Sequence, residues 1–145
     1  MRTIFLSLFI CVACLLSAKS FKINQKTDVK PFSIKIEKME VLPNETVFHI
    51  KVKQQNNFSY SIDFEDCYVK TSADSEPIKG ELKTWNNDKK IYRTVKTISN
   101  EDDEKLTLSF PTIDIPNTQP FTLKIGDIQN RDKTEIIIKD LKTKK

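Results

Sequence analysis

Apolar residues recur at every second position along much of the chain. Residues 32–36, 47–53 and 58–64 each alternate isoleucine, valine or an aromatic side chain with polar side chains. Successive side chains of a β-strand point to opposite faces, so a period of two predicts strands with one buried face. After the first twenty residues, no stretch keeps the spacing of an amphipathic helix. The pattern therefore predicts an all-β protein.

Further predicted strands follow at intervals of about 8 to 12 residues, with Pro-, Asn- and Asp-containing connections between them. They cover Cys67–Lys70, Gly80–Trp85, Ile91–Ser99, Leu106–Phe110, Phe121–Ile125 and Glu135–Lys139. Eight or nine short strands with one apolar face each predict a two-sheet antiparallel β-sandwich, and a small β-barrel is the alternative.

The spacing of the strands gives the chain an immunoglobulin-like appearance. It lacks the Cys…Trp…Cys pattern of true immunoglobulin domains, because Cys67 is the only cysteine after residue 20. We expect one domain over residues 31–145, a length that suffices for a single apolar core. Residues 21–30 are expected to form a polar, partly disordered N-terminal segment.

The first twenty residues have the pattern of a secretory signal peptide. Arg2 supplies the positive start, Ile4–Leu16 is uncharged and apolar, and Ala18-Lys19-Ser20 offers small residues for cleavage after Ser20. The apolar run is shorter than the ~20 residues that a membrane-spanning helix needs, and no second run follows. We expect a secreted protein without a membrane span.

Charge disfavours nucleic acid as a partner. The formal net charge is +4, and loss of Arg2 and Lys19 with the leader would lower it to +2. Lysine and glutamate are interspersed along the chain, whereas a nucleic-acid-binding protein needs a one-sided basic surface. The densest basic stretch, residues 139–145, is interpreted as a solvated end.

Cys67 would be the only cysteine of the mature chain, so no intramolecular disulfide can form. The apolar phase is even up to Phe64 and odd at Cys67 and Val69. A bulge at Glu65–Asp66 would keep both phases on the core side, which predicts a buried, inert thiol.

Two other roles for cysteine remain open. Cys67 could join two chains, so the protein is expected to be a monomer or a Cys67-linked dimer. Cys14 follows Val12-Ala13, which resembles the end of a bacterial lipobox, although the apolar run continues past it.

The sequence offers no catalytic constellation. His49 is the only histidine, and alternation places it on the solvent side of its strand. The acidic run 100–104 does not match the spacing of an EF-hand calcium loop and is interpreted as a solvated connection. We assign no catalytic residue, no metal and no cofactor, and expect no enzyme activity.

Trp85 and Tyr92 are the candidate binding residues. A hairpin centred on 86–89 would pair Trp85 with Lys90 and Lys83 with Tyr92, so that both aromatic residues share a lysine-rich face. Two such rings can stack on a sugar or anchor a partner protein. Packing of both rings against the core is the alternative.

Asn44 and Asn57 begin the tripeptides Asn-Glu-Thr and Asn-Phe-Ser, which are N-glycosylation acceptors in a eukaryotic host. They flank the predicted strand Val47–Lys53 at opposite ends. We expect any binding face to lie away from these two ends.

Together these features predict a secreted, non-enzymatic recognition or adhesion module, glycosylated on asparagine. Its partner would be a protein or a glycan at the cell surface or in the matrix. Two alternatives remain. One is a bacterial periplasmic structural or assembly protein, and the other is a secreted enzyme inhibitor that presents the loop Pro111–Pro120.

Overall fold

The computed structural model describes residues 18–56, 60–86, 89–92, 95–98, 103–113, 121–128 and 133–138. Within these ranges the chain forms twelve β-strands and no helix. The strands are β1 Lys19–Val29, β2 Phe32–Val41, β3 Thr46–Gln54, β4 Tyr60–Asp63, β5 Tyr68–Lys70, β6 Ile78–Lys79, β7 Glu81–Asn86, β8 Lys89–Tyr92, β9 Val95–Ile98, β10 Glu104–Phe110, β11 Phe121–Ile128 and β12 Lys133–Ile138.

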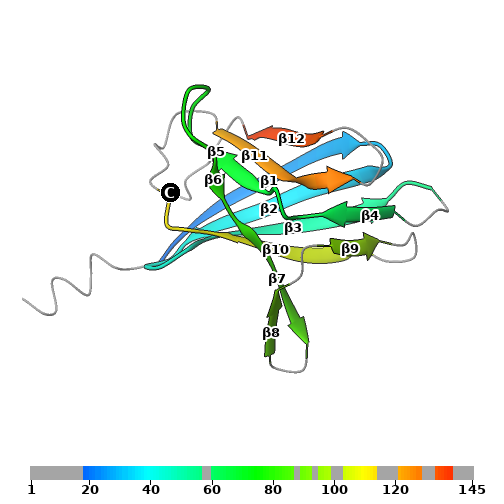
Figure 1. Cartoon of the computed structure of the whole chain (residues 1–145), viewed down its shortest axis with the longest axis horizontal. Coiled ribbons are helices and arrows are strands. Elements are labelled where there is room, and N and C mark those ends of the chain that lie inside the picture. The colour runs from blue at the N-terminus through cyan, green and yellow to red at the C-terminus, as the bar shows by residue number, and fades with distance from the viewer. Residues whose placement is uncertain are drawn as a thin grey trace, which may run out of the picture.

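The strands form two sheets that pack face to face (Figure 1). The first sheet has the order β1-β2-β3-β10-β7-β8, and the second has the order β6-β5-β11-β4-β9 with β12 also paired to β11. All the strand pairs are antiparallel. The predicted all-β sandwich is thus confirmed, and because the sheets do not close, the barrel alternative is wrong.

The core lies between the sheets and is almost entirely aliphatic and aromatic. Phe48 of the first sheet meets Phe110 edge to face, with ring centroids 5.6 Å apart, and Phe121 of the second sheet at 5.9 Å. Aromatic pairs at these separations add to the stability that burial supplies. The alternating apolar residues of 32–36 and 48–52 are all buried, as the pattern predicted.

Residues 21–30 differ from the expectation. They are not a separate polar segment, because most of them lie in β1, which pairs with β2 from Lys19↔Val41 to Val29↔Phe32. Phe21, Ile23 and Val29 pack against the core. β1 also includes the last two residues of the predicted leader, so cleavage after Ser20 would shorten this strand at its start.

Two further strand boundaries differ from the prediction. The segment 91–99, expected to be one strand, contributes β8 to the first sheet and β9 to the second. β6 was not predicted; it pairs with β5 over Tyr68↔Lys79 and Val69↔Ile78. With β1, these differences account for the larger number of strands.

β4 and β5 lie along the same side of β11 as one interrupted strand. Ile62 pairs with Ile128, and Val69 pairs with Leu123. The interruption is a turn at Glu65–Asp66, closed by a hydrogen bond from Cys67 N to Phe64 O of 3.1 Å. The predicted change of phase at these two residues is confirmed, since apolar side chains on both sides of the turn are buried.

Part of β7 and β8 extends beyond the sandwich as a hairpin (Figure 1). β10 pairs with β7 only over Glu81, Leu82 and Lys83. Beyond them, β7 pairs only with β8 among the strands described. The register of this hairpin is the one that the sequence predicted, with Lys83 opposite Tyr92 and Trp85 opposite Lys90.

No described segment is a helix long and apolar enough to cross a membrane. Residues 1–17, which hold most of the predicted leader, are outside the described part of the chain.

Candidate functional site

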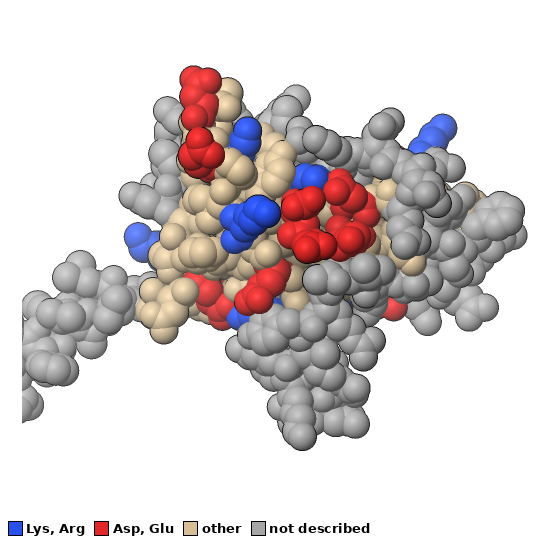
Figure 2. Space-filling view, in the orientation of Figure 1, with Lys and Arg blue, Asp and Glu red and all other residues tan. Residues whose placement is uncertain are grey.

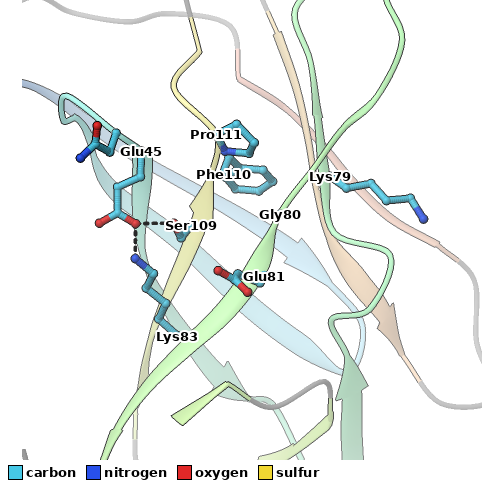
Figure 3. Close-up of a pocket in the computed structure, with 9 residues that line it drawn as sticks. Glu45, Lys79, Gly80, Glu81, Lys83, Ser109, Phe110 and Pro111 are labelled. Carbon is cyan, nitrogen blue, oxygen red and sulfur yellow. Dashed lines mark hydrogen bonds and ion pairs between the residues drawn. The ribbon is translucent and has the colours of Figure 1, made fainter. Parts of the chain in front are cut away.

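The first sheet carries a hollow of about 450 Å³ near the start of β3, the start of β7 and the end of β10 (Figure 3). This volume lies within the usual range for small-ligand sites, about 300 to 1,000 Å³. We call it the sheet-end hollow. Its lining residues are Asn44, Glu45, Lys79, Gly80, Glu81, Lys83, Ser109, Phe110 and Pro111.

Strand register brings three polar residues together beside this hollow. Glu45 directly precedes β3, whose Val47 is opposite Ser109 of β10. On the other side of β10, Ser109 is opposite Glu81, two positions before Lys83 in β7. Because Leu82 and Leu108 turn into the core, their neighbours Lys83 and Ser109 lie on the outer face.

Glu45, Lys83 and Ser109 form a compact polar cluster. The ammonium of Lys83 donates to Glu45 Oε2, and the Ser109 hydroxyl donates to the same oxygen at 2.5 Å. The side chain of Lys83 is only 9% exposed and that of Glu45 25%. A buried ammonium needs a charged, hydrogen-bonded partner, so Glu45 is what makes the burial of Lys83 tolerable.

The rest of the hollow combines a backbone floor with a polar rim. Gly80 forms part of the floor, and a Cβ there would clash with the ring of Phe110 and lie 2.7 Å from Ser109 O. Asn44, Glu81 and Pro111 are exposed around it. The hollow thus offers a carboxylate, an amide and an exposed proline ring to a polar molecule.

The cluster brings an ammonium and a hydroxyl to one carboxylate oxygen, Glu45 Oε2. Among the residues that the structure describes, no group of three or more His, Cys, Asp or Glu side chains is arranged to hold a metal ion.

His49 lies on the outer face of β3, where alternation placed it. Its Nε2 is 2.8 Å from Glu40 Oε2, and Lys38 Nζ donates to Glu40 Oε1 at 2.7 Å. These contacts lower the pKa of Glu40 from its ordinary value of 4.5, with the Lys38 hydrogen bond as the larger cause and the His49 bond next. His49 is therefore hydrogen-bonded to the Lys38–Glu40 ion pair on the outer face of β2 and β3.

Cys67 lies in the core with no exposed surface and no disulfide partner. Burial raises the pKa of its thiol to about 11. Its carbonyl accepts a hydrogen bond of 3.1 Å from Gly80 N, which ties the turn after β4 to the floor of the sheet-end hollow.

The other candidate residues divide between described and undescribed parts of the chain. Asn44 is exposed in the turn between β2 and β3 and lines the hollow. Asn57 lies outside the described residues, as do the side chains of Trp85 and Tyr92 and most of the acidic run 100–104 and of the loop 111–120. Lys83 nevertheless belongs to both the hairpin and the hollow. It is opposite Tyr92 in the hairpin, and it donates to Glu45 in the polar cluster.

A second polar group lies on the second sheet. Lys124 Nζ is 2.9 Å from Asp127 Oδ1 and 5.7 Å from the centre of the Tyr68 ring. Asp127 is opposite Asp63, whose carboxylate accepts a hydrogen bond from Glu65 N. Figure 2 shows acidic side chains gathered over the turn between β4 and β5 and the end of β11. The ammonium of Lys124 offsets some of this negative charge.

Comparisons of the chain with known protein families, with curated proteins and with solved structures found no match.

Proposed function

We propose that this protein is a secreted, non-enzymatic recognition or adhesion module that binds a protein or glycan at the cell surface or in the matrix. The observation that carries the proposal is the β7–β8 hairpin, which extends beyond the sandwich (Figure 1). A two-stranded ribbon outside the sheet layers presents both its faces to other molecules. In the register of the hairpin, Trp85 and Tyr92 belong to the same face of the ribbon, which supports a role for both in holding a partner.

The base of the hairpin supports the same proposal. Lys83 lies where the hairpin leaves the sheet, and its ion pair with Glu45 ties this position to the start of β3. A recognition element gains affinity when its base is fixed before binding, because less freedom is then lost in the complex. The basic residues Lys89 and Lys90 on β8 favour a partner with negative charge.

The test compares the two faces of the hairpin. The secreted, fluorescently labelled chain is applied to cells, to extracellular matrix and to an immobilised glycan panel. Trp85→Ala and Tyr92→Ala are expected to weaken binding at least about tenfold, as the loss of an aromatic hot spot does. The matched controls are Thr84→Ala and Ile91→Ala, which change the opposite face of the same strands. Unchanged binding by the two aromatic variants would overturn the proposed face.

A further inference from the structure

Asn44 combines exposure with a fixed backbone. It lies in the turn between β2 and β3, and the neighbouring Leu42 N donates to Glu45 O at 2.8 Å across this turn. From outside the turn, the Thr112 hydroxyl donates to Pro43 O at 3.2 Å. A group attached to the Asn44 side chain would therefore start from a defined point at the rim of the sheet-end hollow.

Thr46, the third residue of the same acceptor tripeptide, is fully buried in the folded protein. Its hydroxyl accepts a hydrogen bond of 3.0 Å from Ile113 N, and the residue lies opposite Val41 of β2 and Phe110 of β10. An enzyme that recognises the threonine hydroxyl cannot reach it there. Modification of Asn44 must precede the docking of β10 and of Ile113, which lies 67 positions after Thr46 in the chain.

We propose that Asn44 carries an N-linked glycan, added before β10 pairs with β3, and that its first sugar occupies the sheet-end hollow. In the modification, the side-chain amide nitrogen of Asn44 forms a bond to the anomeric carbon of an activated glycosyl diphosphate. The diphosphate leaves with the bonding electron pair, and the amide gives up one proton to solvent. The proposal rests on the secreted location proposed above, and it assigns an occupant to the hollow, of which the binding proposal uses only the Glu45–Lys83 pair.

The walls of the hollow suit a sugar ring. The exposed ring of Pro111 offers an apolar surface, and the Glu81 carboxylate can accept hydrogen bonds from sugar hydroxyls. A sugar in this position would also exclude water from the Glu45–Lys83–Ser109 cluster, where the ion pair strengthens as the surroundings become less polar.

The experiment uses the full chain secreted by a eukaryotic cell line that makes high-mannose glycans. Its glycans are left intact, trimmed to the first sugar with an endoglycosidase, or removed completely with an amidase. Amide hydrogen exchange is then followed at Gly80–Lys83 and Ser109–Phe110. We expect slow exchange in the intact and trimmed forms. Complete removal should speed exchange about tenfold, the effect of losing roughly 1.4 kcal/mol of local stabilisation.

Two variants control for charge and for the second acceptor. Complete removal converts the asparagine to aspartate, so Asn44→Gln, which has no glycan and no added charge, should show the same faster exchange. Asn57→Gln should leave exchange at the hollow unchanged. A secreted chain with unmodified Asn44 would overturn the whole inference but not the secreted location. Equal exchange in trimmed and sugar-free forms would overturn only the placement of the first sugar in the hollow. Retention of the chain inside the cell with its leader attached would overturn the secreted location as well.

Discussion

At the scale of single residues, the outer faces of both sheets hold a lysine that is almost completely buried. Lys83 on the first sheet is paired with Glu45, and Lys124 on the second is paired with Asp127. Lysine is seldom buried without a partner, because desolvation of its charge is costly. In both places the partner carboxylate is more exposed than the lysine, so each pair still has one side in contact with water.

The Glu40 group gives a prediction about acid stability. The pKa of Glu40 is lowered in the folded protein, so the unfolded state binds the proton more readily. Glu40 therefore contributes stability above its unfolded pKa and loses it as the pH falls through its lower folded pKa. Since its side chain is 29% exposed, the effect should be at most about 1 kcal/mol.

Urea unfolding of Glu40→Gln and the unchanged protein measures this effect. The variant should be less stable at pH 7, and the difference should shrink as the pH falls below 4.5. Glu76→Gln makes the same charge change in the exposed connection before β6 and should cost little at either pH. A difference that is equally large at pH 7 and at pH 3 would contradict the assigned cause.

At the scale of elements, β1 is the strand that the alternation analysis missed. It pairs with β2 along nearly its whole length and carries partly buried apolar residues at both ends. Phe21→Ala should lower the free energy of unfolding by about 1 to 2 kcal/mol, because the ring packs against the core. Lys22→Ala, the exposed neighbour, should change it by less than about 0.5 kcal/mol.

Denaturant unfolding of a chain that begins at Phe21, the start expected after leader cleavage, measures both variants. Equal stability of the Phe21 and Lys22 variants would show that this end of β1 is not held against the sandwich in solution.

The reason for missing β1 lies in its middle. The half-buried positions alternate regularly from Phe21 to Val29 in spite of the register shift between Lys22 and Gln25. Two of them, Gln25 and Thr27, are polar. Alternation in apolarity cannot detect a strand whose inward residues are polar.

Other elements could be predicted because the residues that specify them are close together in the sequence. The change of phase at Glu65–Asp66 located the irregularity between β4 and β5, although the structure has a turn there and not the predicted bulge. The Asn-Asp segment after Trp85 gave the hairpin register. The Glu45–Lys83–Ser109 cluster was not predicted. Its members come from three separate strands or strand ends, and alternation specifies the face of a side chain but not its neighbouring strand.

At the scale of the whole molecule, Cys67 reports on how the sandwich opens. The thiol lies between the sheets, and with a pKa of about 11 only about one molecule in a thousand would be ionised at pH 8. Alkylation by iodoacetamide at pH 8 should therefore be very slow in the native protein and complete after unfolding. Its rate should rise with urea in parallel with the unfolded fraction.

Mass spectrometry of the quenched samples follows the reaction, and a non-reducing gel shows whether chains are linked. Rapid alkylation without urea, or a Cys67-linked dimer in freshly prepared protein, would show that the second sheet opens readily.

The position of β11 has a consequence for the speed of folding. β1, β2 and β3 are consecutive in the chain and pair through short connections, so their contacts are local. In the second sheet β4, β5 and β12 all pair with β11, and Ile62 must meet Ile128. Closing so long a stretch of chain costs entropy before any contact is gained. The β3–β10 pairing of the first sheet needs a closure of similar length, since Phe110 meets Thr46. The part β1-β2-β3 can thus form before β10 and the second sheet, and until they dock, its apolar face stays open to aggregation.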